Sequence, residues 1–120
     1  MTPLEETLLI WKKAEEIKNK NYIINNYYDT LFEAKSKAIK ILNETLSEEY
    51  YLYTCPLCQK HKSNYDDCDR CPLGNYYGIT ENSLHFLGCT PPYIRAVKEN
   101  KYDHMIYVLE VLVQREKEGL

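Results

Sequence analysis

The sequence contains no long apolar run and no basic segment that leads into an apolar one near its start. A transmembrane helix needs about 20 predominantly apolar residues, and a secretory signal joins such a basic start to an apolar stretch and a small-residue cleavage site. We therefore expect a soluble, intracellular protein with no membrane partner. Its 120 residues support a single domain with a modest core.

Catalytic patterns are also missing. No nucleophile with a matching base and no paired carboxylates stand out, and Gly74 and Gly78 lack the spacing that cradles a phosphate. Asp66, Asp67 and Asp69 lie beside a cysteine pair, where we expect them to solvate a loop. The sequence predicts a protein that is not an enzyme.

Clusters of basic residues are absent except for Lys12 and Lys13, which we expect on a solvated helix face. The formal net charge is −3. Because nucleic-acid binders neutralise phosphates with clustered Lys and Arg, this balance disfavours a general DNA or RNA binder.

Phenylalanine is scarce, with two residues against twelve tyrosines. Compositional bias of the genome is the simpler explanation. A Tyr-rich surface that contacts a protein or stacked bases is the alternative. The sequence does not separate the two.

Five cysteines lie between residues 55 and 89, four of them in two Cys-x-x-Cys pairs. Two thiolates spaced by two residues can bind one face of a metal ion, and two such pairs complete the tetrahedron of a structural Zn²⁺ site. Intracellular thiols stay reduced, which favours metal binding over disulfides. The predicted ligands are Cys55, Cys58, Cys68 and Cys71. A closed site of this kind predicts a structural role.

Other residues leave the ligand set open. His85 precedes Cys89 by four residues, a spacing that puts both on one helical face, and either can replace one of the four thiolates. An iron–sulfur cluster is the alternative cofactor, and Cys71–Pro72 is similar to the end of a ferredoxin cysteine run. The tight cysteine triplet of that run is missing, so zinc is favoured. His104 has no companion residue, and we expect it to be ordinary.

Capping signals and apolar periodicity predict a helix before the cysteines. Thr2, Pro3 and Glu5 form a capping box, and Trp11 lies on the apolar stripe that follows. We expect Trp11 in the core, and the Asn-rich stretch 19–26 ends the helix. The rest of the stripe is Leu4, Leu8, Ala14 and Ile17, with Lys18 as the alternative to Ile17.

A second helix is expected from about Asp29 to Leu46, with a short strand at 50–53 after it. Lys35 interrupts its apolar stripe. The stripe consists of Tyr28, Leu31, Phe32, Ile39, Leu42 and Leu46.

Two helices are expected after the cysteines. Thr90 and Pro91 begin the first, and a break at 100–103 separates it from a second over 103–118, with Gly119 as its stop. The apolar face of the first starts with Tyr93, Ile94 and Val97, and that of the second consists of Met105, Val108, Leu109, Leu112 and Val113.

Residues 55–88 are poor in periodic apolar residues and rich in turn formers such as Gly74–Asn75. We expect this segment to have no hydrophobic core of its own. Zinc is its natural organiser, because structural Zn²⁺ supplies about 10–16 kcal/mol of binding free energy. Without metal we expect the segment to be disordered.

In outline the chain resembles a loose group of small uncharacterised proteins encoded by phages, prophages and other mobile elements. The similarity lies in Trp11 on the first helix, the Cys-Pro-Leu-Cys pair at 55–58, the Cys-x-x-Cys-Pro-Leu run at 68–73, and Cys89 with Pro92–Tyr93 after it. The resemblance implies metal binding and a mobile-element origin, and it implies no activity.

These observations predict a mainly α fold, with a small α+β arrangement as the alternative. Three to four helices would pack around a zinc-ordered, loop-rich segment with at most a short β-hairpin. We expect one domain over 1–120, comprising a helical part at 1–50, the cysteine-rich metal segment at 51–89 and the C-terminal helices at 90–120.

The leading functional hypothesis is a non-enzymatic interaction protein of viral or mobile-element origin. It would bind a host or viral protein, for example to block a defence complex in the host cytoplasm. One alternative is a nucleic-acid-binding zinc module or small regulator that uses tyrosines with Lys60, Lys62 and Arg70. The other is an iron–sulfur redox or sensor protein.

Overall fold

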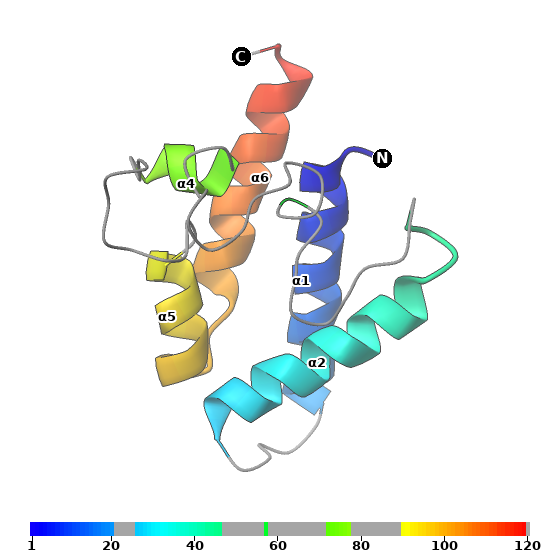
Figure 1. Ribbon diagram of the computed structural model, residues 1–120, viewed down its shortest axis with the longest axis vertical. Helices are drawn as coiled ribbons and strands as arrows, with labels where there is room; N and C mark the ends of the chain where they lie inside the picture. Colours follow the sequence, from blue (N-terminus) through cyan, green and yellow to red (C-terminus); the bar gives the residue numbers. More distant parts are fainter. Residues whose placement is uncertain (21–25, 47–56, 58–71, 78–89, 120) are drawn as a thin grey trace.

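The described residues are mainly helical and include no strand, as Figure 1 shows for the computed structural model. The model describes residues 1–20, 26–46, 57, 72–77 and 90–119. Its helices are α1 (Pro3–Lys20), α2 (Tyr27–Leu42), α4 (Pro72–Tyr76), α5 (Thr90–Glu99) and α6 (Asp103–Lys117). The mainly α prediction is confirmed. The strand predicted at 50–53 lies outside the described residues.

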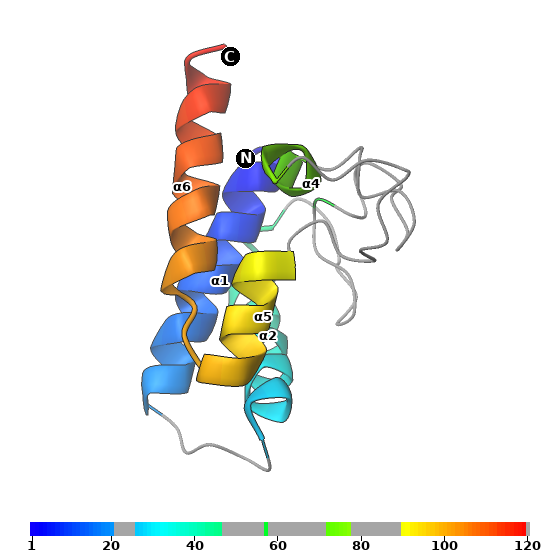
Figure 2. The same cartoon turned by 90° about the vertical axis from the view of Figure 1, so that its left-hand side faces the viewer.

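Helix α1 occupies the centre of the arrangement. It contacts α2 on one side and α6 on another, while α5 contacts both α2 and α6. The short helix α4 contacts α6. In Figure 2, α6 runs along one outer side of the molecule. Tyr107, Glu110 and Gln114 of this helix are exposed.

The predicted capping box at the start of α1 is confirmed. The Glu5 backbone N–H donates to Thr2 Oγ1 at 3.3 Å, and the Thr2 backbone N–H donates to Glu5 Oε1 at 3.0 Å. This backbone hydrogen bond lowers the pKa of the Glu5 carboxyl. Two N–H groups that the first turn cannot bond internally are thereby satisfied.

Helix α2 begins earlier and ends earlier than predicted. Asn26 caps it, with Oδ1 accepting a hydrogen bond from the Asp29 N–H at 2.8 Å. The prediction that Tyr28 lies on the buried stripe was wrong, because its side chain is 48% exposed. Ala34 and Ala38 are buried and complete the stripe instead.

The break between α5 and α6 occurs where it was predicted. Asn100 has φ of +57°, a left-handed conformation that Asn tolerates better than most residues. Ile94 is 41% exposed, so its predicted place on the apolar face was wrong, and Pro92 and Ala96 are buried there. Gly119 ends α6 with φ of +77°.

All five residues predicted to face inward from α6 are buried. They join one core cluster with Trp11, which is 3% exposed, as the helical periodicity predicted. The cluster also contains Leu57 and Leu73, which come from the cysteine-rich part of the sequence.

Candidate functional site

Two leucines from the cysteine-rich part of the sequence lie in the helical core. Leu57 is 0% exposed and Leu73 is 2% exposed, and both belong to the same cluster as the helices. Leu57 is the third residue of the Cys-Pro-Leu-Cys pair, and Leu73 follows the second pair by two residues. Each pair is therefore covalently next to a side chain that the helical core holds in place.

All five cysteines and His85 lie outside the described residues. Within the part of the chain that the structure does describe, no three His, Cys, Asp or Glu side chains gather to hold a metal ion. The predicted zinc ligands stay a prediction. Their chemistry fits the ion, since thiolates are preferred ligands of Zn²⁺.

A helical turn stands where turn residues predicted a loop. Helix α4 (Pro72–Tyr76) begins directly after Cys71, and the loop prediction at Gly74–Asn75 was wrong. Proline is favoured at a first helical position, because its ring fixes φ there and its missing N–H would have no partner. This turn brings two tyrosines against α6.

The first contact between α4 and α6 involves a histidine. The Tyr77 hydroxyl lies 3.0 Å from Nε2 of His104, within hydrogen-bond distance. The two residues are 27 positions apart, so no local sequence pattern predicted this contact. The second contact places the Arg115 guanidinium carbon 5.6 Å from the centroid of the Tyr76 ring.

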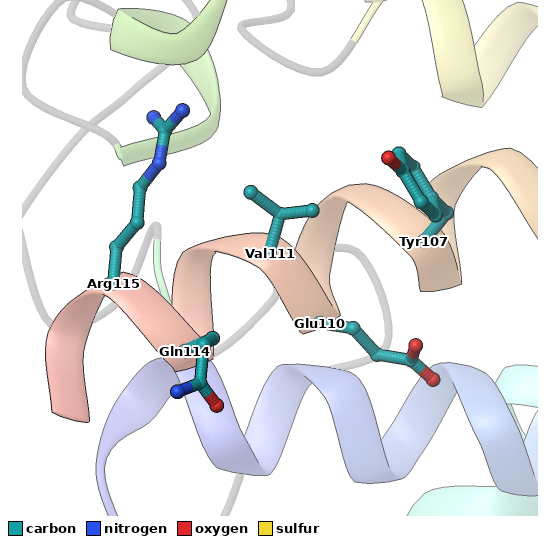
Figure 3. A pocket seen from close by; sticks show the side chains of 5 residues that line it. All are labelled: Tyr107, Glu110, Val111, Gln114 and Arg115. Atoms are coloured by element: carbon teal, nitrogen blue, oxygen red, sulfur yellow. The ribbon is translucent and has the colours of Figure 1, made fainter. Parts of the chain in front are cut away.

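An open hollow of about 300 Å³ follows the solvent face of α6. It is lined by Tyr107, Glu110, Val111, Gln114 and Arg115. Figure 3 shows Tyr107, Val111 and Arg115 in a row along the helix, with Arg115 extending toward α4. We call these three residues with Tyr76 the α6 patch.

The α6 patch combines an apolar surface with one cation. Tyr107 is 62% exposed and Tyr76 is 38% exposed. Glu110, on the edge of the row, forms a salt bridge with Lys12 of α1 at 3.4 Å. These residues were not predicted from the sequence. The available signal is the spacing of Tyr107, Val111 and Arg115 by four, on the side of the helix opposite the buried stripe.

Buried aromatic rings join α1 to the break before α6. The rings of Trp11 and Tyr102 meet edge to face, with centroids 5.5 Å apart. Lys35 Nζ lies 5.3 Å from the Trp11 centroid, and Lys18 Nζ lies 4.8 Å from that of Tyr102. The lysine that interrupted the apolar stripe of α2 thus covers a ring. Lys18 also donates a 2.8 Å hydrogen bond to the Asn100 carbonyl oxygen.

Tyr102 is 0% exposed, and its hydroxyl has no hydrogen-bond partner in the structure as described. Tyr102→Phe is therefore expected to raise the free energy of unfolding by about 1 kcal/mol at neutral pH, because it removes an unsatisfied buried group. Urea unfolding measures this change. Tyr107→Phe, whose hydroxyl is on an exposed side chain, is the control and should have little effect.

The same variant has a pH signature. Burial raises the pKa of the Tyr102 phenol. An unfolded chain ionises tyrosine at about pH 10, whereas folded Tyr102 stays neutral to higher pH, so the free energy of unfolding of the wild type falls as the pH rises beyond about 10. The advantage of Tyr102→Phe should widen there. A variant that is no more stable than the wild type at either pH would contradict the interpretation.

Comparison of the chain with protein-family models, with curated proteins and with solved structures gave no match. In the described residues, no helix is both long enough and apolar enough to cross a membrane. The proposed function is therefore inferred from the α6 patch and from Leu57 and Leu73, the buried residues next to the cysteine pairs in the sequence.

Proposed function

We propose that the protein is a zinc-stabilised, non-enzymatic interaction protein that binds a host or viral protein through the α6 patch. The observation that carries this proposal is a row of three α6 residues that line one hollow, namely exposed Tyr107, half-buried Val111 and exposed Arg115. Tyr and Arg are the residue types most enriched, with Trp, among side chains that dominate binding energy at protein interfaces.

The charge of the patch supports a protein partner over a nucleic acid. Arg115 is its single cation, and Glu110 lies at its edge. Backbone phosphates attract clustered basic residues, and their affinity rests on several such contacts. A mixed apolar and singly charged surface instead suits a protein interface with an aromatic centre and a polar rim.

Zinc would order the cysteine-rich segment at 51–89, which connects the N-terminal helices to the C-terminal ones. Two Cys-x-x-Cys pairs with a nine-residue spacer match a structural Cys₄ site. The burial of Leu57 and Leu73 beside those pairs supports this role, because the metal and the core would hold the same short stretches. Elemental analysis of purified protein should give one equivalent of zinc, whereas an iron–sulfur chromophore would contradict the proposal.

The proposed origin rests on the resemblance of the cysteine segment to phage and mobile-element proteins. A small protein of that origin with no catalytic pattern and an exposed binding face is suited to blocking a host complex, such as a defence complex. Its site of action would then be the host cytoplasm.

Partner binding is expected to depend on Tyr107. Tyr107→Ala should weaken capture of the partner at least about 30-fold, since truncating a central interface tyrosine typically costs about 2 kcal/mol or more. Proteins captured from host lysate by immobilised wild-type and variant chains, then titrated individually, measure this loss. Tyr28→Ala on α2 is the matched control, because Tyr28 is 48% exposed and lies outside the patch.

The control variant should keep the wild-type affinity. If Tyr107→Ala captured the same partners with unchanged affinity, the α6 patch would not be the binding surface. The proposal in this form would then be wrong.

A further inference from the structure

The solvent face of α6 has an internal symmetry. Tyr107 and Arg115 each lie four positions from Val111, one before it and one after it, so all three share a helix face. His104 in the first turn of α6 and Glu118 at its C-cap each lie seven positions from Val111, which is close to two helical turns. The face thus carries unlike partners at equal distances on the two sides of a central apolar residue.

A surface of this kind is complementary to itself. In a two-fold symmetric contact, residue i on one copy meets residue j on the other and the reverse pair forms as well. Suppose that two α6 helices lie antiparallel, with the two-fold axis passing next to Val111 of both copies. Each residue before Val111 in one copy then faces the residue that lies the same number of positions after Val111 in the other copy. Tyr107 then faces the second copy's Arg115, and His104 faces the second copy's Glu118.

The geometry points to a second copy of this chain as the occupant of the α6 patch, packed as an antiparallel α6–α6 pair. This inference rests on the part of the proposed function that makes the α6 patch a binding surface, and it names a different occupant of that surface. The Arg115 guanidinium already lies 5.6 Å from the Tyr76 ring. A guanidinium is planar and has two faces, so the second copy's Tyr107 can stack on the other face.

The acidic edge of the patch does not oppose this arrangement. Two Glu110 carboxylates approach the axis in the pair, and each is already paired with Lys12 of its own copy at 3.4 Å. The 15 residues of α6 span about 22 Å at 1.5 Å per residue. Because one helix of this length covers less than the about 800 Å² per partner of a standard interface, the dimer should be weak, with a dissociation constant in the micromolar range.

Sedimentation equilibrium of the purified, zinc-loaded protein tests the pair. The wild type should convert from monomer to dimer between about 1 µM and about 1 mM. Tyr107→Lys places two cations opposite each other and should raise the dissociation constant at least about tenfold. Tyr107→Lys combined with Arg115→Glu restores opposite charges across the axis and should recover dimerisation. Tyr28→Lys, the same change on α2, should have no effect.

The double variant makes the test specific to this register. If Tyr107→Lys weakens the dimer only because apolar surface is lost, the double variant should dimerise no more tightly than Tyr107→Lys alone. That outcome would overturn the inference. A wild type that stays monomeric to about 1 mM would overturn it as well.

These results separate the inference from the proposed function. If the purified chain is monomeric while capture of a lysate protein still depends on Tyr107, the self-association is wrong and the proposed function stands. If the dimer forms and is rescued by the charge exchange while no other protein is captured through the patch, the inference stands and the host-partner proposal is wrong.

Discussion

Removing zinc with a strong chelator is expected to lower the free energy of unfolding by about 4 kcal/mol, relative to protein with free zinc at about 1,000 times its dissociation constant. The physical reason is that metal binding to the cysteine pairs and folding of residues 55–88 would be one coupled process. The effect should reach the helices, because Leu57 and Leu73 share their core. Urea unfolding followed by circular dichroism, with and without chelator, measures it.

Two serine variants locate the ligands. Cys58→Ser removes a thiolate from a predicted ligand pair and should abolish binding of the single zinc equivalent at neutral pH. Cys89→Ser is the matched control, since it removes the same group from a cysteine outside the pairs. Loss of zinc in the control would move Cys89 into the ligand set, and a chelator that leaves the unfolding curve unchanged would contradict the structural role.

Leu57→Ala is expected to lower the free energy of unfolding by about 2–5 kcal/mol. Leu57 is 0% exposed, so the change removes buried apolar surface and leaves a cavity at the contact between the cysteine segment and the helices. The same change should weaken zinc binding, because the segment that supplies the ligands loses its attachment to the core. Urea unfolding and competition with a zinc-binding dye measure the two effects.

Ile41→Ala is the control for Leu57→Ala. Ile41 is another large aliphatic residue, and it is 61% exposed on α2. Its truncation should change the free energy of unfolding by no more than about 0.5 kcal/mol. Equal unfolding midpoints for the two variants would show that Leu57 contributes nothing to the core.

The helices could be predicted because their signals are local. The capping box joins Thr2 to Glu5 within one turn, and the buried stripe of α6 repeats at helical spacing over 15 residues. Hydrogen-bond donors at the helix start and the position of apolar side chains on one face decide both features. Neither depends on what the rest of the chain does.

The contacts of the cysteine segment could not be predicted in the same way. Leu57 and Leu73 are isolated apolar residues in a polar stretch, so they form no periodic pattern. Tyr77 and His104 meet only because α4 packs on α6. The burial of Tyr102 likewise depends on its contact with Trp11, 91 positions earlier in the chain. Tertiary packing determines these features, and the spacing of residues in the sequence does not predict them.

The exposed residues of α6 illustrate an intermediate case. The buried stripe of this helix was predicted correctly, and the opposite face follows from it by geometry. What the sequence does not reveal is that α4 places Tyr76 beside Arg115 and leaves Tyr107 uncovered. The helix face that carries the candidate site could therefore be predicted from the sequence. The contribution of α4 to that site could not.

Helix α1 is joined at both ends to residues from the far end of the chain. Thr2 Oγ1 donates a hydrogen bond to the Glu116 carboxylate, and Lys18 donates one to the Asn100 carbonyl. On the ribosome, Tyr102 is made roughly 5 to 20 seconds after Trp11, at typical rates of synthesis. Helices α1 and α2 can pair during that time, but the side of Trp11 that meets Tyr102 stays uncovered. The nascent chain is thus exposed to chaperones, proteases and aggregation until its last helix arrives.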